Sequence, residues 1–191
     1  MDAAQQMLIK WALMLTDKIA AGASVAAEIM DSVHLSCTIK CAKPIILIHG
    51  TKDNHVPYNG GAIKGQNGGN GKDGYSFSAD SSFHLWAERD GCKGNYITEN
   101  LPNKVKKDNC IVVKETYTNC NGDNNVILYK IINGGHTWPG SNSTIVTQLL
   151  LGNTNEDINA GVETWNFFKT RTLQNCNGAN KFSAGITSQE Q

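Results

Sequence analysis

The sequence predicts an α/β domain with a mostly parallel sheet, because helical and strand-like segments alternate along the chain. The clearest strand is residues 44–49, PIILIH, an apolar run rich in isoleucine that Gly50 closes. A continuous run of this kind is typical of a parallel strand that is covered on both faces. Two further apolar runs, 111–117 and 126–132, predict strands, and the turn-forming residues 119–124 between them predict a hairpin.

Three segments have the composition and spacing of helices. Residues 3–18 contain good helix formers without Gly or Pro, and apolar side chains cover most of the circumference, as in a buried helix. Residues 78–90 begin with a Ser or Asp cap and are expected to carry Phe83 and Trp86 inward. Residues 156–170 place four apolar side chains at helical spacing, with acids at the start and bases at the end. These four are Ile158, Val162, Trp165 and Phe168.

The remaining segments are small, polar or rich in glycine. Residues 19–27 are small and apolar and predict a short buried strand. Residues 59–74 hold seven glycines and predict a loop. That loop lacks the GxxxxGK[ST] pattern and a following helix, so nucleotide binding is disfavoured. Residues 177–191 form a polar tail.

Length and charge limit the possible functions. A chain of 191 residues suits one domain, which we place at residues 1–176. Lys plus Arg equals Asp plus Glu at 17 each, so the chain lacks the positive excess of a nucleic-acid binder. The longest apolar stretch, residues 7–15, contains Lys10 and is too short to span a bilayer, so no membrane partner is expected.

Six cysteines point to an oxidising compartment. No CxxC pair occurs, and Cys37 and Cys41 have no histidines at zinc-finger spacing, so disulfides are the favoured interpretation. The residues leave all fifteen pairings open. Asn142 begins a glycosylation sequon, which matters in a eukaryotic secretory setting. Together these features predict a secreted protein, although the N-terminus shows no export signal. The cysteines are Cys37, Cys41, Cys92, Cys110, Cys120 and Cys176.

Two short segments carry candidate chemistry, and each follows a predicted strand. Residues 49–58 read HGTKDNHVPY, and residues 133–140 read NGGHTWPG. Because active sites of parallel sheets lie at the carboxyl ends of strands, Asp53 and His136 are expected to meet. The histidine would act as general base and then general acid, while the carboxylate fixes its tautomer. The order of acid before histidine suits the Ser…Asp…His order of an α/β-hydrolase.

Simpler interpretations exist for the same residues. Asp53 could be an ordinary turn residue, because Asp is common in turns. Trp138 could line an acyl or sugar pocket, or could only cover the loop. Tyr58 is expected to pack. The other histidines are read as structural: His49 as a hydrogen-bonded residue at the strand end, His55 as a loop residue, and His34 and His84 as structural or exposed. A metal site formed by His49, Asp53, His55 and His136 is conceivable but disfavoured, so no metal is expected.

The motifs in this order resemble a known family. PIILIHGTKDNHVPYNGG at 44–61 and VILYKIINGGHTWPG at 126–140 are similar to the polyhydroxybutyrate depolymerase-like esterases. These are α/β-hydrolases related to the feruloyl and acetylxylan esterases of carbohydrate esterase family 1. The resemblance extends over about residues 3–170, and three smaller features agree with it. They are WAERDGC at 86–92, Tyr117 three residues before Cys120, and WNFF at 165–168.

The resemblance implies an activity and a set of residues. It implies a serine esterase that acts on a polyhydroxyalkanoate, or on feruloyl or acetyl esters of plant polysaccharide, without a cofactor. Asp53 would be the triad acid and His136 the triad base. It also suggests that Cys92 pairs with Cys120 and braces loops beside the site.

One element of the family pattern is missing. The family's nucleophile is a serine in a G-x-S-x-G turn, and no such pattern occurs here. Residues 3–18 resemble the helix that follows that turn, so the chain is expected to be the C-terminal portion of an α/β-hydrolase domain, without the N-terminal strands and the nucleophile elbow. None of Ser24, Ser141 and Ser143 is expected on a strand-to-helix elbow.

The missing nucleophile leaves a second interpretation open. The chain could be a catalytically inactive remnant that acts as a binding or assembly module. In that case the strand expected near residues 19–27 would lose its central neighbour and present an exposed apolar edge. Exposed edges pair readily with other chains, so a homodimer is expected.

Overall fold

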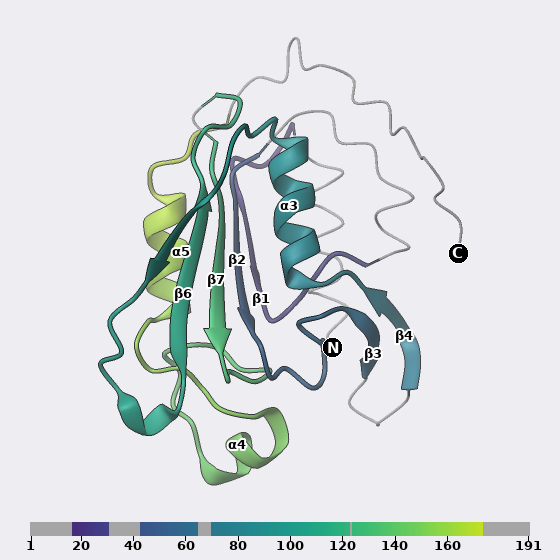
Figure 1. Ribbon diagram of the computed structural model, residues 1–191, viewed down its shortest axis with the longest axis vertical. Helices are drawn as coiled ribbons and strands as arrows, with labels where there is room; N and C mark the ends of the chain where they lie inside the picture. The colour runs from purple at the N-terminus through teal and green to yellow at the C-terminus, as the bar shows by residue number, and fades with distance from the viewer. Residues whose placement is uncertain (1–16, 31–42, 65–69, 123, 174–191) are drawn as a thin grey trace.

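The computed structural model describes residues 17–30, 43–64, 70–122 and 124–173. A five-stranded sheet in the order β1-β2-β7-β6-β5 forms its centre, and β3 and β4 form a separate two-stranded sheet (Figure 1). The strands are β1 (Gly22–Val25), β2 (Ile45–Gly50), β3 (Gly61–Lys64), β4 (Asn70–Ser76), β5 (Ile97–Asn100), β6 (Ile111–Tyr117) and β7 (Val126–Ile132). The helices are α3 (Ala79–Arg89), α4 (Ile145–Leu151) and α5 (Ala160–Phe168), with a 3₁₀ turn η1 (Lys106–Asp108).

The central sheet is mixed, which is compatible with an α/β fold but corrects the expectation of a mostly parallel sheet. β2 lies between β1 and β7 and is parallel to both. β6 is antiparallel to β7, as a short hairpin connection requires, and β5 is antiparallel to β6. Strand β5 was not predicted, because all four of its residues are exposed and it shows no apolar alternation.

Strand β2 separates two apolar cores, one on each face of the sheet. Ile45 and Leu47 pack into the core that contains α3, with Phe83 and Trp86 from that helix. Ile46 and Ile48 pack into the core that contains α5. Successive side chains of a strand point to opposite faces, so a strand buried on both faces must be apolar throughout. The prediction for residues 44–49 is therefore confirmed, and Figure 1 shows the two helices on opposite sides of the sheet.

Two helix predictions can be compared with the structure. α3 begins where expected, because the Ser78 hydroxyl accepts a hydrogen bond from the Ser81 N–H at 3.0 Å, and its inward side chains are as predicted. α5 begins at Ala160, four residues later than expected. Of the four apolar side chains at helical spacing, Val162 and Trp165 are 53% and 66% exposed. Ala160 and Phe167 are the buried residues of this helix instead.

Other expectations are confirmed, corrected or untested. The strand expected near 19–27 is β1, and the predicted hairpin is β6–β7. The region 59–74 is not only loop, because β3 and β4 pair across it. Its glycines gave no strand signal, yet cross-strand hydrogen bonds form there regardless of side chain. Residues 3–16 of the expected first helix and the tail 177–191 lie outside the described residues. No helix in the described part of the chain is long and apolar enough to cross a membrane.

Candidate active site

The carboxyl ends of three neighbouring parallel strands lie side by side at one end of the sheet. Glu28 follows β1, Asp53 follows β2, and His136 follows β7. β1, β2 and β7 are adjacent and parallel, so the segments that leave them lie side by side. α4 extends from the same edge (Figure 1). The candidate residues thus come together through sheet topology.

Asp53 and His136 are in direct contact, as expected from the sequence. Nδ1 of His136 lies 2.8 Å from Oδ2 of Asp53. The Asp53 side chain is completely buried, whereas the His136 side chain is 19% exposed. A proton on Nδ1 donated to this carboxylate leaves the lone pair on Nε2. No described residue forms a hydrogen bond with Nε2, so this nitrogen is available to a reacting group.

The second oxygen of Asp53 is held by the backbone of its own turn. Oδ1 accepts hydrogen bonds from the N–H groups of His55 and Val56, both at 2.8 Å. Burial alone would raise the pKa of Asp53. The hydrogen bonds and charges of His136 and His49 outweigh that effect and hold the pKa well below its usual range. Asp53 is therefore an oriented, ionised carboxylate.

His49 is a fully hydrogen-bonded histidine at the end of β2, as expected. Its Nδ1 lies 2.7 Å from Oε1 of Glu28, and its Nε2 lies 2.9 Å from the Val56 carbonyl oxygen. Oδ2 of Asp53 is 3.5 Å from the same Nε2. Burial alone would lower the pKa of His49, but the hydrogen bonds to Asp53 and Glu28 raise it to about 10.

Glu28 was not among the residues predicted to form the site. A signal was present, because Glu28 is the only charged residue of the segment 19–29, which is otherwise composed of small and apolar residues. A lone charge in such a segment needs a partner once the segment is buried. His49, 21 residues later, is that partner.

Glycines allow the backbone segments of the site to approach closely. A Cβ on Gly50, at the end of β2, would lie 2.4 Å from the Gly134 carbonyl oxygen. A Cβ on Gly135 would lie 1.9 Å from the Leu151 carbonyl oxygen. That same oxygen accepts the backbone N–H of His136 at 2.6 Å. Gly135 and His136 therefore contact the C-terminal end of α4, which leaves no room for a side chain at residue 135.

Helix α4 presents an apolar patch beside the site. It has no buried residue, and Ile145 and Leu149 are 85% and 82% exposed. The ring of His55 lies between this helix and the site, with its centroid 5.1 Å from that of His136 and Nε2 3.4 Å from the Leu150 carbonyl oxygen. We call Ile145, Val146, Leu149 and Leu150 the α4 patch.

Two aromatic residues near the site differ in their surroundings. Tyr58 is buried, and its hydroxyl donates to Asp80 at 2.6 Å, so it packs as expected. Trp138, two residues after His136, is half exposed. Its contact with substrate stays a prediction.

None of the candidate serines forms a hydrogen bond with His136 in the described residues. Ser24 lies in β1, and its hydroxyl donates to the Ala27 carbonyl oxygen at 2.6 Å. Ser141 and Ser143 lie in the loop before α4, and neither hydroxyl forms a hydrogen bond with His136. Ser24 therefore braces the turn after β1.

Within the residues that the structure describes, no group of three or more His, Cys, Asp and Glu side chains is arranged to hold a metal ion. The conceivable cluster does not form a cation site, because its groups bond one another. Asp53 accepts from His136, and His49 uses both ring nitrogens.

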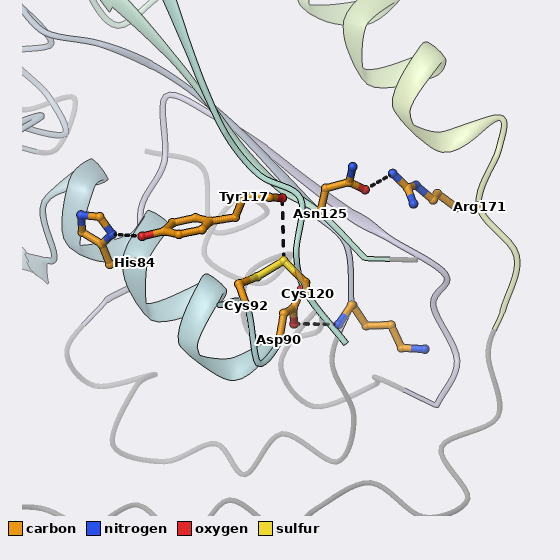
Figure 2. The surroundings of a disulfide bond; sticks show 8 residues. His84, Asp90, Cys92, Tyr117, Cys120, Asn125 and Arg171 are labelled. Carbon is orange, nitrogen blue, oxygen red and sulfur yellow. Dashed lines mark hydrogen bonds between the residues drawn. A yellow bond between two sulfur atoms is a disulfide. The ribbon is translucent and has the colours of Figure 1, made fainter. Parts of the chain in front are cut away.

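The disulfide implied by the family resemblance is present between Cys92 and Cys120 (Figure 2). Its expected place beside the site is wrong. Cys120 lies before the amino end of β7, whereas His136 follows the carboxyl end of that strand. The disulfide joins the segment after α3 to the β6–β7 turn, at the amino end of β7 and therefore at the opposite end of the sheet from His136. Cys110 is a buried free thiol, and Cys37, Cys41 and Cys176 lie outside the described residues.

A buried carboxylate accompanies the disulfide. Oδ1 of Asp90 accepts the backbone N–H of Lys43 at 3.0 Å (Figure 2). Asp90 is almost completely buried, and Oδ2 has no hydrogen-bond partner among the described residues. Burial raises the pKa of Asp90 to about 8, and the Lys43 N–H only partly offsets this effect.

Comparison with known proteins gives one informative similarity. The chain is 36% identical over 124 residues to feruloyl esterase B of Piromyces equi. The aligned part is 64% of this chain and 21% of that protein, so the chain spans about a fifth of the length of this relative. No family model matches, and no solved structure matches. The similarity supports a relationship to esterases and agrees with the resemblance found in the motifs.

Proposed function

We propose that this chain carries the acid–base residues of a carboxylic ester hydrolase with an α/β-hydrolase fold. The observation that carries the proposal is the 2.8 Å hydrogen bond between Asp53 and His136 at the carboxyl edge of parallel strands. His136 takes a proton at Nε2 from the nucleophile and then delivers it to the leaving alcohol. Asp53 holds the ring in the tautomer that makes this possible and stabilises the imidazolium that forms.

The nucleophile in this mechanism is a serine hydroxyl presented to Nε2 of His136. The 191 residues contain no G-x-S-x-G pattern, and Ser24 is engaged with a backbone carbonyl. The feruloyl esterase relative is much longer than the matched segment. We therefore place the nucleophile in polypeptide that would precede these residues in a longer protein.

The substrate is proposed to have an apolar acyl or aromatic part. The α4 patch and Trp138 offer exposed apolar surface next to His136. A polyhydroxyalkanoate, or feruloyl or acetyl esters of plant polysaccharide, would fit this surface. The disulfide and the esterase relative support an extracellular location.

Two measurements test the proposal. The first is to sequence the coding region upstream of Met1, where an in-frame G-x-S-x-G is expected. The second is to express the extended polypeptide and assay it on p-nitrophenyl acetate and methyl ferulate. His136→Ala is expected to lower kcat by at least about 10³-fold, as in other triad enzymes. His84→Ala, on the outer surface of α3, is the matched control. Equal rates for His136→Ala and the parent protein would contradict the assignment.

A non-catalytic role as a binding or assembly module is the second candidate. In the described part of the chain, β1 is at the edge of the five-stranded sheet. Edge strands pair with other chains, which favours a homodimer through β1. Sedimentation or size exclusion at working concentration tests this candidate. A clean monomer would argue against the dimer.

A further inference from the structure

Beneath Asp53 and His136, two buried residues continue the same series of contacts. Glu28 contacts His49 at 2.7 Å, His49 lies 3.5 Å from Asp53, and Asp53 contacts His136 at 2.8 Å. The series alternates carboxylate and imidazole groups. The side chains of Glu28, His49 and Asp53 are 0–1% exposed, so only His136 reaches solvent.

The contacts of His49 determine its charge. Its Nδ1 faces a carboxylate oxygen of Glu28, and its Nε2 faces the Val56 carbonyl oxygen with Asp53 behind it. All three groups are acceptors, and a neutral imidazole has only one N–H to donate. A neutral ring would set a lone pair against an oxygen, whereas the doubly protonated ring satisfies both sides. Among the described residues, a further titratable neighbour is Tyr58, whose ring packs edge-on with its centroid 5.8 Å from that of His49.

The backbone before Glu28 adopts a rare conformation. Ala26, directly after β1, has φ of 52°, in the left-handed region that costs a residue with a Cβ roughly 1 kcal/mol. The Ser24 hydroxyl and the Ala26 N–H hold this turn, through bonds to the Ala27 and Ile48 carbonyl oxygens. Strained backbone of this kind persists where the surrounding contacts require it, and here it delivers Glu28 to His49.

We infer that Glu28 and His49 are positioning residues for Asp53: Glu28 keeps His49 doubly protonated, and His49 keeps Asp53 ionised with Oδ2 aimed at His136. This role rests on the proposed function. Two carboxylates and two imidazoles have zero net charge only when both imidazoles are protonated. With His49 protonated, the charge of Glu28 is balanced, and the charge of Asp53 is left to stabilise the imidazolium that forms at His136 during the reaction.

Nuclear magnetic resonance of the ¹⁵N-labelled chain tests the inference without any ester hydrolysis. Imidazole nitrogens give distinct ¹⁵N shifts in the protonated and unprotonated states, so each ring reports its own charge. In the parent chain both nitrogens of His49 are expected to stay protonated between pH 5 and pH 8. His49→Gln assigns the signals.

Glu28→Gln is the decisive variant, and Glu163→Gln is its matched control, because Glu163 accepts a hydrogen bond from Tyr129 away from the site. Glu28→Gln is expected to lower the titration midpoint of His49 by about one pH unit or more and to shift the low-field Nδ1–H resonance of His136. The control is expected to change neither signal.

A neutral His49 ring in the parent chain at pH 7 would overturn the inference, whether or not the variant folds. Unchanged His49 and His136 signals in a folded Glu28→Gln chain would also overturn it. Neither result depends on activity, so this inference and the proposed function can fail separately.

Discussion

Oδ2 of Asp53 and Nδ1 of His136 lie 2.8 Å apart, although 83 residues separate them in sequence. The two residues leave neighbouring parallel strands, β2 and β7, at the same edge. Asp53 is anchored by two backbone N–H groups on its other oxygen. The distance between the two side chains therefore depends on the pairing of β2 with β7 and on the turn that contains Asp53. A change in either is expected to alter it.

Asp53→Asn is expected to destabilise the protein in a pH-dependent way. The pKa of Asp53 is depressed in the folded state, while an unfolded Asp titrates at about 3.9. Its stabilisation is therefore complete above about pH 4 and is lost as the pH falls below that value. Urea denaturation is expected to give a loss of about 1–3 kcal/mol at pH 7 and a smaller loss at pH 3. The exposed control Glu99→Gln is expected to change little, and an equal loss for Asp53→Asn at both pH values would contradict the prediction.

Gly135→Ala is expected to disturb the site through the backbone. The new Cβ would lie 1.9 Å from the Leu151 carbonyl oxygen, so the loop or the end of α4 must move. We expect a loss of about 1–3 kcal/mol in the free energy of unfolding, together with a shift of the His136 imidazole resonances. Gly161→Ala in α5 is the control, because its nearest contact would be a side-chain oxygen at 3.2 Å and alanine favours the helix. Unchanged resonances in Gly135→Ala would refute the prediction.

Removal of the disulfide is expected to lower stability and leave the site intact. Cys92 and Cys120 are 28 residues apart, and a closed loop of that length contributes about 3–4 kcal/mol in the chain-entropy model. The double variant Cys92→Ala/Cys120→Ala is therefore expected to unfold at lower denaturant concentration. The imidazole resonances of His136 should not move, because the disulfide is at the other edge of the sheet. Movement of these resonances in the folded variant would contradict that separation.

Asp90→Asn is expected to stabilise the protein above about pH 4. The pKa of Asp90 is about 8 in the folded state and about 3.9 in the unfolded state. The free energy of unfolding of the parent protein therefore falls as the pH rises from 4 to 8. An asparagine oxygen can still accept the Lys43 N–H. The advantage of the variant should grow across this window and then stay constant, as thermal unfolding at pH 4, 6 and 9 would show. A constant difference across the three pH values would argue against a buried, neutral carboxyl.

The α4 patch gives a prediction about surface binding. Ile145→Ser with Leu149→Ser removes two exposed apolar side chains, so the free energy of unfolding should change by less than about 1 kcal/mol. Binding of the apolar dye anilinonaphthalene sulfonate, followed by fluorescence, is expected to fall. Val162→Ser removes an exposed apolar side chain from another helix, α5, outside the α4 patch, and it should not affect dye binding. Equal dye binding by all variants would remove the case for an apolar binding surface.

The sequence was sufficient to predict the elements whose side-chain polarity matches the burial of their positions. Residues 45–50 are all buried, and residues 45–48 are apolar throughout, so their strand was predictable. The same holds for Ser78 as a cap and for Asp53 and His136 as a pair, because topology places strand ends together. Where local preference and tertiary context differ, prediction failed. β5 is exposed at every position, and α5 exposes Val162 and Trp165 although both are apolar residues at helical spacing.

The missed parts of the site depended on three-dimensional pairing. Glu28 has no motif, and only its contact with His49 explains a charge in that apolar segment. The position of the disulfide depended on which end of β7 lies near Cys120, and a pairing alone does not reveal that. A family resemblance can thus identify which cysteines form a disulfide without showing how far that disulfide lies from the catalytic site.

The alignment of β2 between β1 and β7 has a consequence for studies of folding. A slip of one residue would turn the side chains of β2 to the opposite faces and carry Asp53 away from His136. The Asp53–His136 hydrogen bond therefore exists only when three strands have assembled in one alignment. Its low-field proton is a single-atom reporter of correct assembly, and it would distinguish a natively ordered molecule from a compact misfolded one of equal helix and strand content.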